Sequence, residues 1–308
     1  ESRHNMAAEK FRQVPLVCPG HSRGVVELNF SSATDDGVFL MSACLDNKPM
    51  LRRADTGDWV GTFEGHKGAV WGADIDRPAL RAVTASADYT VKVWDTLSGD
   101  MLHSLEHKRI VKGCAFSSES KNIVTGGFDK VVRIFDMDNL DADPSEFVGA
   151  DGNIRCVRFL PGNELIVAGS SDGKVRMWDR RSGEVVNTAD IGASVNAIEL
   201  SYDGTTLCVC GGKNVAILNS ADLSLVQSFQ LSIEVEAVSL HPSKETFVAG
   251  GSTDFWVRTF NASTGEETEC LRGHHGPIHC LKYSPDGHTF ASGSGDATIR
   301  IWQTKPEL

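Results

Sequence analysis

The sequence predicts an all-β fold, a ring of seven four-stranded blades known as a β-propeller. Its main support is a tight-turn Asp, followed by alternating apolar residues, that recurs along most of the 308 residues. The copies are Asp46, Asp88, Asp129, Asp172, Asp254 and Asp296. Successive gaps are 42, 41, 43, 82 and 42 residues, so the long gap holds two periods, and Lys213-Asn214 stands at the missing copy. Seven units of this length indicate a repeat array in which each unit is one blade.

Two further signals accompany the Asp. In most copies an aromatic residue follows six positions later, at Trp94, Phe135, Trp178, Phe260 and Trp302. Gly-His or a remnant of it lies upstream, at Gly20-His21, Gly65-His66, Glu106-His107, Gly149-Ala150 and Gly273-His274. Together with Trp94-Asp95 and Trp178-Asp179, this pattern resembles the WD-repeat family. The resemblance implies a seven-bladed WD-repeat β-propeller with units of roughly 40–45 residues.

Blade two shows how the residues specify the strands. Strands are expected at residues 69–75, 81–86, 91–95 and 101–105. In the third of these, Val91 and Val93 alternate with Lys92 and Trp94, the two-residue period of a strand. One blade cannot bury both of its faces, so the blades must stack against their neighbours.

The last copy predicts how the ring closes. It ends after its third strand at Gln303, with too few residues left for a fourth. We therefore expect the N-terminal strand, residues 14–18, to pair with residues 298–302 and complete the last blade. The predicted organisation is an N-terminal extension at 1–13, the propeller at 14–304 and a tail at 305–308, with a natural start at Met6.

Composition narrows the function classes. The net charge is −11, which disfavours a surface devoted to nucleic acid, because phosphate binding relies on basic residues. Eight cysteines without a C-x-x-C pair favour a reducing compartment. No apolar run reaches membrane-span length and no signal peptide is evident. We expect a cytoplasmic protein that also enters the nucleus, with no membrane association; the tripeptides at 29–31 and 261–263 are not expected to be glycosylated.

Polar residues that imitate a catalytic triad recur in two blades. Blade two has His66, Thr84, Asp88 and Trp94, and blade seven has His274, Ser292, Asp296 and Trp302. A His/Ser/Asp set is also the constellation of nucleophilic hydrolases. The family resemblance implies instead a structural network: Asp accepts from His, His bonds the hydroxyl, and the hydroxyl bonds the Trp indole. An active site needs one constellation rather than several, so we expect no catalytic residue and no enzyme activity.

Other blades keep only parts of this network. Blade one has Arg52 at the Trp position, and blade six lacks both the His and the hydroxyl. We therefore expect Asp254 of blade six to contribute less to stability than Asp88.

No cofactor or metal site is predicted. His274-His275 and His279 are close in sequence but lack Cys or carboxylate partners at zinc-ligand spacing. The glycine pairs Gly126-Gly127, Gly211-Gly212 and Gly250-Gly251 fall where second strands end. Crowding between blades explains them better than phosphate binding does.

A binding surface is predicted where propellers usually bind, around the channel. One position in each first strand is expected to point to this face: Val26, Trp71, Lys112, Arg155, Asn196, Glu236 and His279. Basic residues gather on blades three and four, namely Lys108, Arg109, Lys112, Lys130, Arg155 and Lys174, while Glu234 and Glu236 lie across the ring. Ordinary surface charge is the alternative to a dock for an acidic segment, with Trp71 as its aromatic anchor. We expect Lys112 and Arg155 at the surface.

Longer segments resemble one group of scaffolds within the family. They are residues 44–52, 55–63, 65–73, 273–280 and 299–304. The resemblance implies a non-catalytic adaptor, monomeric within larger assemblies, that contacts RNA only indirectly. The implied partners are the survival-of-motor-neuron complex through Gemin proteins, which loads Sm rings onto spliceosomal RNA, an unr-like RNA-binding protein, and receptor serine/threonine kinases. The C-terminal motifs are shared with subunit i of translation initiation factor 3, which is the alternative reading.

Overall fold

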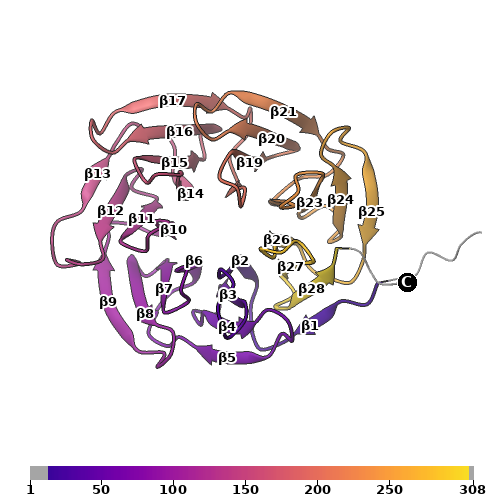
Figure 1. The fold of residues 1–308 in the computed structure, drawn as a ribbon, viewed down its shortest axis with the longest axis horizontal. Coiled ribbons are helices and arrows are strands. Elements are labelled where there is room, and N and C mark those ends of the chain that lie inside the picture. Colours follow the sequence, from indigo (N-terminus) through magenta and orange to yellow (C-terminus); the bar gives the residue numbers. More distant parts are fainter. Residues whose placement is uncertain (1–12, 305–308) are drawn as a thin grey trace, which may run out of the picture.

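Seven antiparallel sheets surround a central channel like the blades of a fan (Figure 1). The computed structural model describes residues 13–304; most of the predicted extension and the whole predicted tail lie outside this range. Within it, the chain is entirely strands and turns, and each sheet has four strands. No helical segment of the described chain has the length and apolar character of a membrane span. The seven-bladed all-β prediction is confirmed.

Each of the first six blades runs from the channel outward in chain order. Blades one to three contain β2 (Val25–Phe30), β3 (Phe39–Cys44), β4 (Met50–Arg53), β5 (Trp59–Thr62), β6 (Val70–Ile75), β7 (Arg81–Ser86), β8 (Thr90–Asp95), β9 (Met101–Glu106), β10 (Val111–Phe116), β11 (Asn122–Gly127), β12 (Val132–Asp136) and β13 (Ser145–Phe147). The strands predicted for blade two agree with β6 to β9 to within one residue at each end.

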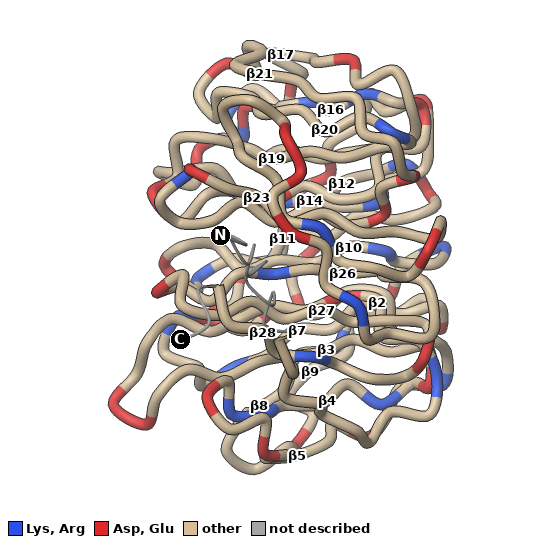
Figure 2. Tube along the Cα trace, turned by 90° about the vertical axis from the view of Figure 1, so that its right-hand side faces the viewer, with Lys and Arg blue, Asp and Glu red and all other residues tan. Residues whose placement is uncertain are grey.

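The remaining blades follow the same order until the last. They contain β14 (Ile154–Phe159), β15 (Leu165–Ser170), β16 (Lys174–Asp179), β17 (Val185–Asp190), β18 (Ala197–Leu200), β19 (Thr206–Gly211), β20 (Asn214–Asn219), β21 (Leu225–Gln230), β22 (Ala237–Leu240), β23 (Thr246–Gly250), β24 (Val257–Asn261), β25 (Glu267–Leu271), β26 (Ile278–Tyr283), β27 (Thr289–Ser294), β28 (Ile299–Gln303) and β1 (Leu16–Cys18). Seen from the side, the ring is a disc with many of its charged residues in the turns at the two faces (Figure 2).

Apolar side chains from adjacent blades share one core at each interface. Between blades four and five, for example, Val167 and Met177 pack with Val195 and Leu207, all fully buried. The glycine pairs at the ends of second strands follow from this crowding. A Cβ atom on Gly126 would lie 2.4 Å from Cγ2 of Ile154 in the next blade, and one on Gly127 would lie 2.2 Å from the carbonyl oxygen of Ile110 in its own blade, so no side chain fits at either position.

The N-terminal strand closes the ring as predicted. In blade seven β1 pairs antiparallel with β28, with Leu16 opposite Ile301 and Cys18 opposite Ile299. The indigo strand therefore lies beside the yellow one in Figure 1. The strand is shorter than predicted, because pairing begins only at Leu16. Cys18 is buried in the core shared by blades seven and one.

Deleting residues 1–18 should open the ring. The deletion removes the outer strand of blade seven and exposes the backbone donors and acceptors of β28, which favours strand-to-strand association. We expect a melting temperature several degrees lower and oligomers in size-exclusion chromatography. Deleting only residues 1–12 is the control and should change neither property; a monomeric 1–18 deletion with unchanged melting would contradict the closure model.

Candidate functional site

The triad-like set of blade two is a hydrogen-bond chain inside the sheet. His66 bonds Asp88 through Nδ1 at 2.8 Å and Thr84 through Nε2 at 2.7 Å. The indole of Trp94 donates to the same Thr84 hydroxyl at 2.8 Å. Asp88 also accepts from the backbone amide of Lys67, so one carboxylate ties the loop before the blade to its central hairpin.

Blade seven repeats this chain with the same geometry. His274 bonds Asp296 at 2.9 Å and Ser292 at 2.7 Å, and Trp302 donates to Ser292 at 2.8 Å. Every member has a protein partner, and the hydroxyls of Thr84 and Ser292 are fully buried. Neither hydroxyl can therefore reach a substrate, and the chains serve to satisfy buried polar groups.

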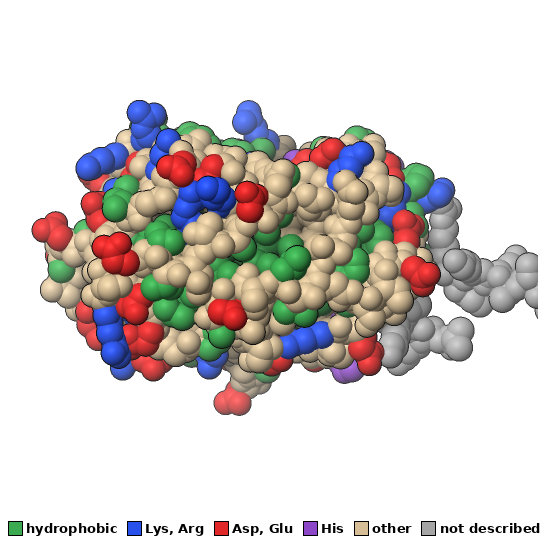
Figure 3. Space-filling view, turned by 90° about the horizontal axis from the view of Figure 1, so that it is seen from above, with side chains coloured by type: hydrophobic (Ala, Val, Ile, Leu, Met, Phe, Trp, Pro, Cys, Tyr) green, Lys and Arg blue, Asp and Glu red, His purple; other side chains and the backbone are tan. Residues whose placement is uncertain are grey.

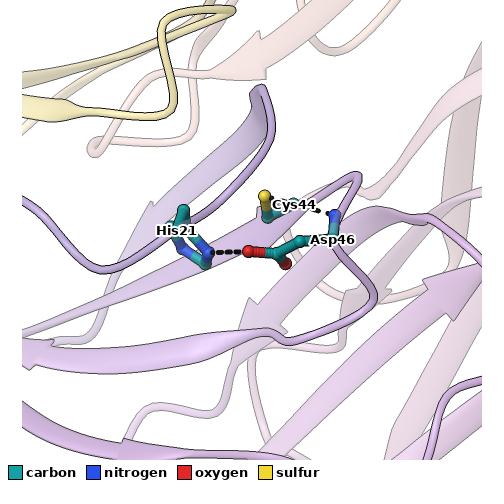
Figure 4. Close-up of side chains that lie close together, drawn as sticks. All are labelled: His21, Cys44 and Asp46. Atoms are coloured by element: carbon teal, nitrogen blue, oxygen red, sulfur yellow. Dashed lines mark hydrogen bonds and ion pairs between the residues drawn. The ribbon is translucent and has the colours of Figure 1, made fainter.

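Blade one modifies the chain and brings a thiol close to it (Figure 4). His21 bonds Asp46 at 3.1 Å and Ser42 at 2.9 Å, and Cys44 lies beside them. Three potential ligands in a group could suggest a metal. However, both imidazole nitrogens already have partners, and burial raises the pKa of the Cys44 thiol to about 12, so that it stays protonated. Arg52, at the Trp position, instead donates to the carbonyl oxygens of Pro19 and Gly57.

In three blades an arginine, rather than a histidine, is the partner of the turn Asp; blade three keeps His107, but that ring bonds Thr125 at 2.9 Å. Arg133 pairs with Asp129 at 2.5 Å in blade three, and Arg176 pairs with Asp172 at 2.7 Å in blade four. In blade six, both terminal nitrogens of Arg258 bond the carboxylate of Asp254. This pairing removes the basis of the expectation that Asp254 contributes less to stability than Asp88, because an Arg four residues after the Asp takes the place of the upstream His.

Blade five, which lacks the Asp altogether, uses an amide. Asn214 donates from Nδ2 to the carbonyl oxygen of Ile191 at 2.9 Å. It thereby links the central hairpin to the loop before the blade, as the Asp carboxylates do elsewhere. Two of the three histidines weighed as zinc ligands have separate protein partners: His274 belongs to the network of blade seven, whereas His279 bonds Glu236.

All seven residues predicted for the binding face line one cavity of about 460 Å³ at the channel. Five of them are the second residue of an innermost strand and the other two directly precede one, and each follows a buried Val or Ile. They are Val26, Trp71, Lys112, Arg155, Asn196, Glu236 and His279. We call this ring of seven residues the channel mouth.

The charged side of the channel mouth lies on blades three and four. The ammonium of Lys112 sits 3.2 Å from the ring centroid of Trp71, a favourable cation–π arrangement. Arg155 donates to the hydroxyl of Ser194 at 3.1 Å. Both side chains are partly buried, so the prediction that they lie at the surface holds only in part. Burial, assisted by the nearby Arg155 charge, lowers the pKa of Lys112 to about 7.

The acidic side of the channel mouth lies on blade six. Glu236 and His279 form a pair at 2.7 Å, and this hydrogen bond lowers the pKa of Glu236 despite its partial burial. Glu234 stands next to them with an exposed side chain. The channel mouth is therefore cationic on one side and anionic on the other, as the sequence predicted.

A second layer of charges, missed from the sequence, crosses the channel below the mouth. Arg158 of blade four reaches Glu27 of blade one at 3.1 Å, and Lys282 of blade seven reaches Glu199 of blade five at 2.7 Å. Three of these residues, Arg158, Glu199 and Lys282, follow a channel-mouth residue by three positions. This three-residue offset is the feature of the sequence that could have located them. The layer is internally paired, which distinguishes it from the cations of the mouth.

A second cavity of about 430 Å³ lies on the outer rim, beside β5 and the turn after β8, and Glu64 is the one charged residue among those that line it. The rest of the outer rim is flatter in character. Over β17 and β21 it shows scattered apolar side chains with charges along both edges (Figure 3). Val186, Leu225 and Val226 are exposed there. Isolated apolar side chains of this kind are ordinary on a protein surface.

Comparison with known proteins agrees with this architecture. The model of the WD domain, G-beta repeat, matches residues 57–95, 99–136, 144–179 and 265–303. Serine-threonine kinase receptor-associated protein of Gallus gallus is 46% identical over 293 residues, covering 95% of this chain and 83% of that protein. The protein of the same name in Dictyostelium discoideum is 44% identical over 290 residues, covering 94% and 98%. Eukaryotic translation initiation factor 3 subunit I of Drosophila grimshawi is 30% identical over 315 residues, covering 93% and 95%.

The chain belongs to the WD-repeat family of β-propellers. Within that family its sequence is nearer to the serine-threonine kinase receptor-associated proteins than to the initiation-factor subunit, by about 15 percentage points of identity (46 and 44% against 30%). Proteins of this family are typically scaffolds for protein interactions, and the reading of this chain as a scaffold rests on that membership.

Replacing Asp254 should be as damaging as replacing Asp88. Asp254→Ala leaves the buried guanidinium of Arg258 with Glu267 as its remaining carboxylate partner, and Asp88→Ala leaves His66 without its acceptor. Each loss should lower the free energy of unfolding by about 1–3 kcal/mol, measured by urea denaturation. Arg258→Met removes the charge that Asp254→Ala leaves unpaired. The double variant Asp254→Ala/Arg258→Met should therefore lose less unfolding free energy than the two single variants lose together. Strictly additive losses would contradict the pairing.

Acid should weaken the fold through the same networks. Burial works against ionisation of Asp88, but hydrogen bonds from Thr90, Lys67 and His66 outweigh it and hold its pKa at about 2, below the unfolded value of 3.8. Its stabilisation is thus complete above about pH 4 and lost as the pH falls through 2. Burial also lowers the pKa of His66 below 6.5, so protonation of the unfolded chain adds to the loss in acid.

Melting temperatures measured between pH 7 and pH 2.5 test whether stability falls in acid. They should fall monotonically, and Asp88→Asn should flatten the part of the curve below pH 4. A wild-type melting temperature that rises on acidification would contradict the assignment.

Proposed function

We propose that this protein is a non-catalytic adaptor that holds partner proteins at the channel mouth. The observation that carries the proposal is the convergence of a stacked Trp71–Lys112 pair, a second cation and an acidic pair around one cavity. Aromatic and arginine side chains in a partly desolvated recess are typical of binding hot spots. The propeller is monomeric in this proposal and enters larger assemblies through its partners.

The partners are proposed from similarity. Relatives at 44–46% identity are named for association with serine-threonine kinase receptors, so receptor serine/threonine kinases are one proposed partner class. The second is the survival-of-motor-neuron complex with its Gemin proteins, together with an unr-like RNA-binding protein. In that setting the adaptor supports spliceosomal ribonucleoprotein assembly and messenger RNA splicing in the cytoplasm and nucleus, and contacts RNA only through partner proteins.

A translation-initiation role is the second candidate. Its support is the 30% identity to subunit I of initiation factor 3 over 93% of the chain. Both candidates are adaptors, and they differ in the complex they enter. Capturing the tagged protein from native lysate separates them: Gemin and Sm proteins support the first candidate, and initiation-factor subunits support the second.

Charge reversal at the channel mouth should weaken partner capture. Lys112→Glu combined with Arg155→Glu removes both cations of blades three and four, and the effect should be larger at low salt than at high salt. The matched control reverses Lys121 and Arg181, which are exposed on the same two blades. They lie in turns at the opposite ends of the strands.

Both double variants change the net charge equally and should keep the wild-type circular dichroism spectrum. Amounts of each partner captured at 50 and 300 mM salt are the measurement. Undiminished capture by the channel-mouth variant, together with loss of capture by the control, would place the dock on the other face.

A further inference from the structure

The two cations of the channel mouth lack the counter-ions that other charged groups of the channel have. Arg158 and Lys282 each pair with a carboxylate in the layer below. By contrast, no carboxylate of residues 13–304 lies within 4.0 Å of the charged nitrogens of Lys112 or Arg155. Lys112 instead lies against Trp71, and Arg155 bonds only a neutral hydroxyl. A desolvated cation without an anion is unfavourable, which points to an anion supplied from outside.

We propose that the channel mouth binds a partner protein segment by one acidic side chain, whose carboxylate enters between Lys112 and Arg155 beside the face of Trp71. This inference rests on the adaptor function proposed above and specifies the chemistry of the partner. Lys112 and Arg155 stand at equivalent positions on β10 and β14, which pack side by side along the channel (Figure 1). A carboxylate between them accepts charge-assisted hydrogen bonds from an ammonium and a guanidinium together.

The same geometry disfavours a polyanion. Glu234 and Glu236 stand on the other side of the 460 Å³ cavity and repel a second negative charge. Nucleic acids carry a phosphate at every nucleotide and need several cations to bind. The charges therefore favour a peptide with one acidic residue flanked by neutral or basic ones, with its basic end toward blade six.

Binding should also take up a proton. Lys112 faces Arg155 and the neutral thiol of Cys156 on β14, Glu27 on β2 and Glu236 next to β22. Because its pKa in the free protein is about 7, part of the population has a neutral Lys112 near pH 7. An incoming carboxylate favours the protonated amine, so affinity should fall as the pH rises above 7.

Selection from a random dodecapeptide phage library tests the chemistry without a known partner. Full-length protein is immobilised, and bound phage are sequenced after counter-selection against Lys112→Met/Arg155→Met. Methionine preserves the packing against Trp71 and adds no charge. Peptides that need the two cations should share one Asp or Glu. Amidating that residue in a synthetic copy should weaken binding at least about tenfold, measured by isothermal titration calorimetry.

Proton uptake is measured in the same experiment with buffers of different ionisation enthalpy. We expect net proton uptake on binding at pH 7 and affinity at least about fivefold weaker at pH 8.5. Lys112→Met should abolish the pH dependence above pH 7. His279→Gln should retain it, because that imidazole belongs to the pair on the acidic side.

Two results would overturn the inference. One is the selection of peptides that have no acidic residue and yet do not bind the Trp71→Ala variant. The adaptor proposal would survive that outcome, but the partner segment would not be acidic. The other is displacement of the selected peptide by a dodecamer of uridine RNA at equal concentration, which would make the channel mouth a phosphate site. The control Lys121→Met/Arg181→Met should bind like wild type, and thermal melting should show that every variant is folded.

Discussion

Ring closure is the constraint on which the rest of the structure depends. Each blade buries its two faces only against its neighbours, so an open ring would leave two faces and one strand edge in water. The chain solves this with three residues, Leu16–Cys18, paired with β28. Cys18 joins Val25, Ile299 and Ile301 in the core between the last and first blades. The channel mouth requires this closure, because its residues come from all seven blades.

Each blade faces the same local problem, and the chain has more than one chemical solution. The hairpin between the second and third strands must be tied to neighbouring backbone or side chains. His–hydroxyl–Trp chains do this in blades two and seven, Asp–Arg pairs in blades three, four and six, and Asn214 in blade five. Blades that lack the family's His and Trp therefore still have an interaction that ties the hairpin, and they keep the same four-stranded form.

Much of the architecture followed from the sequence because repetition averages out local ambiguity. One Trp94-Asp95 pair means little, but a registered series indicates blades, and counting strands located the closure. The position of the channel-mouth residues followed from the same register. The sequence did not predict which side chains contact one another in the folded ring. Asp254 and Arg258 are only four residues apart, but the family pattern directs attention to an upstream His instead. Nothing local indicates that Glu27 meets Arg158 across 131 residues. Such pairs depend on side-chain reach in the closed ring.

The charged residues of the channel that the structure describes fall into two groups, one paired and one without counter-ions. In the lower layer the charged groups meet partners from other blades, as buried ions must if they are not to destabilise the fold. At the mouth, Lys112 is desolvated enough to lower its pKa and yet has no counter-ion among the described residues. Stability alone would favour an apolar side chain in place of Lys112 against the ring of Trp71. Local departures from what the fold requires are expected where a protein meets its ligand. The unpaired cations are therefore the reason for proposing the channel mouth, rather than the paired layer beneath it or the apolar rim, as the surface that a partner completes.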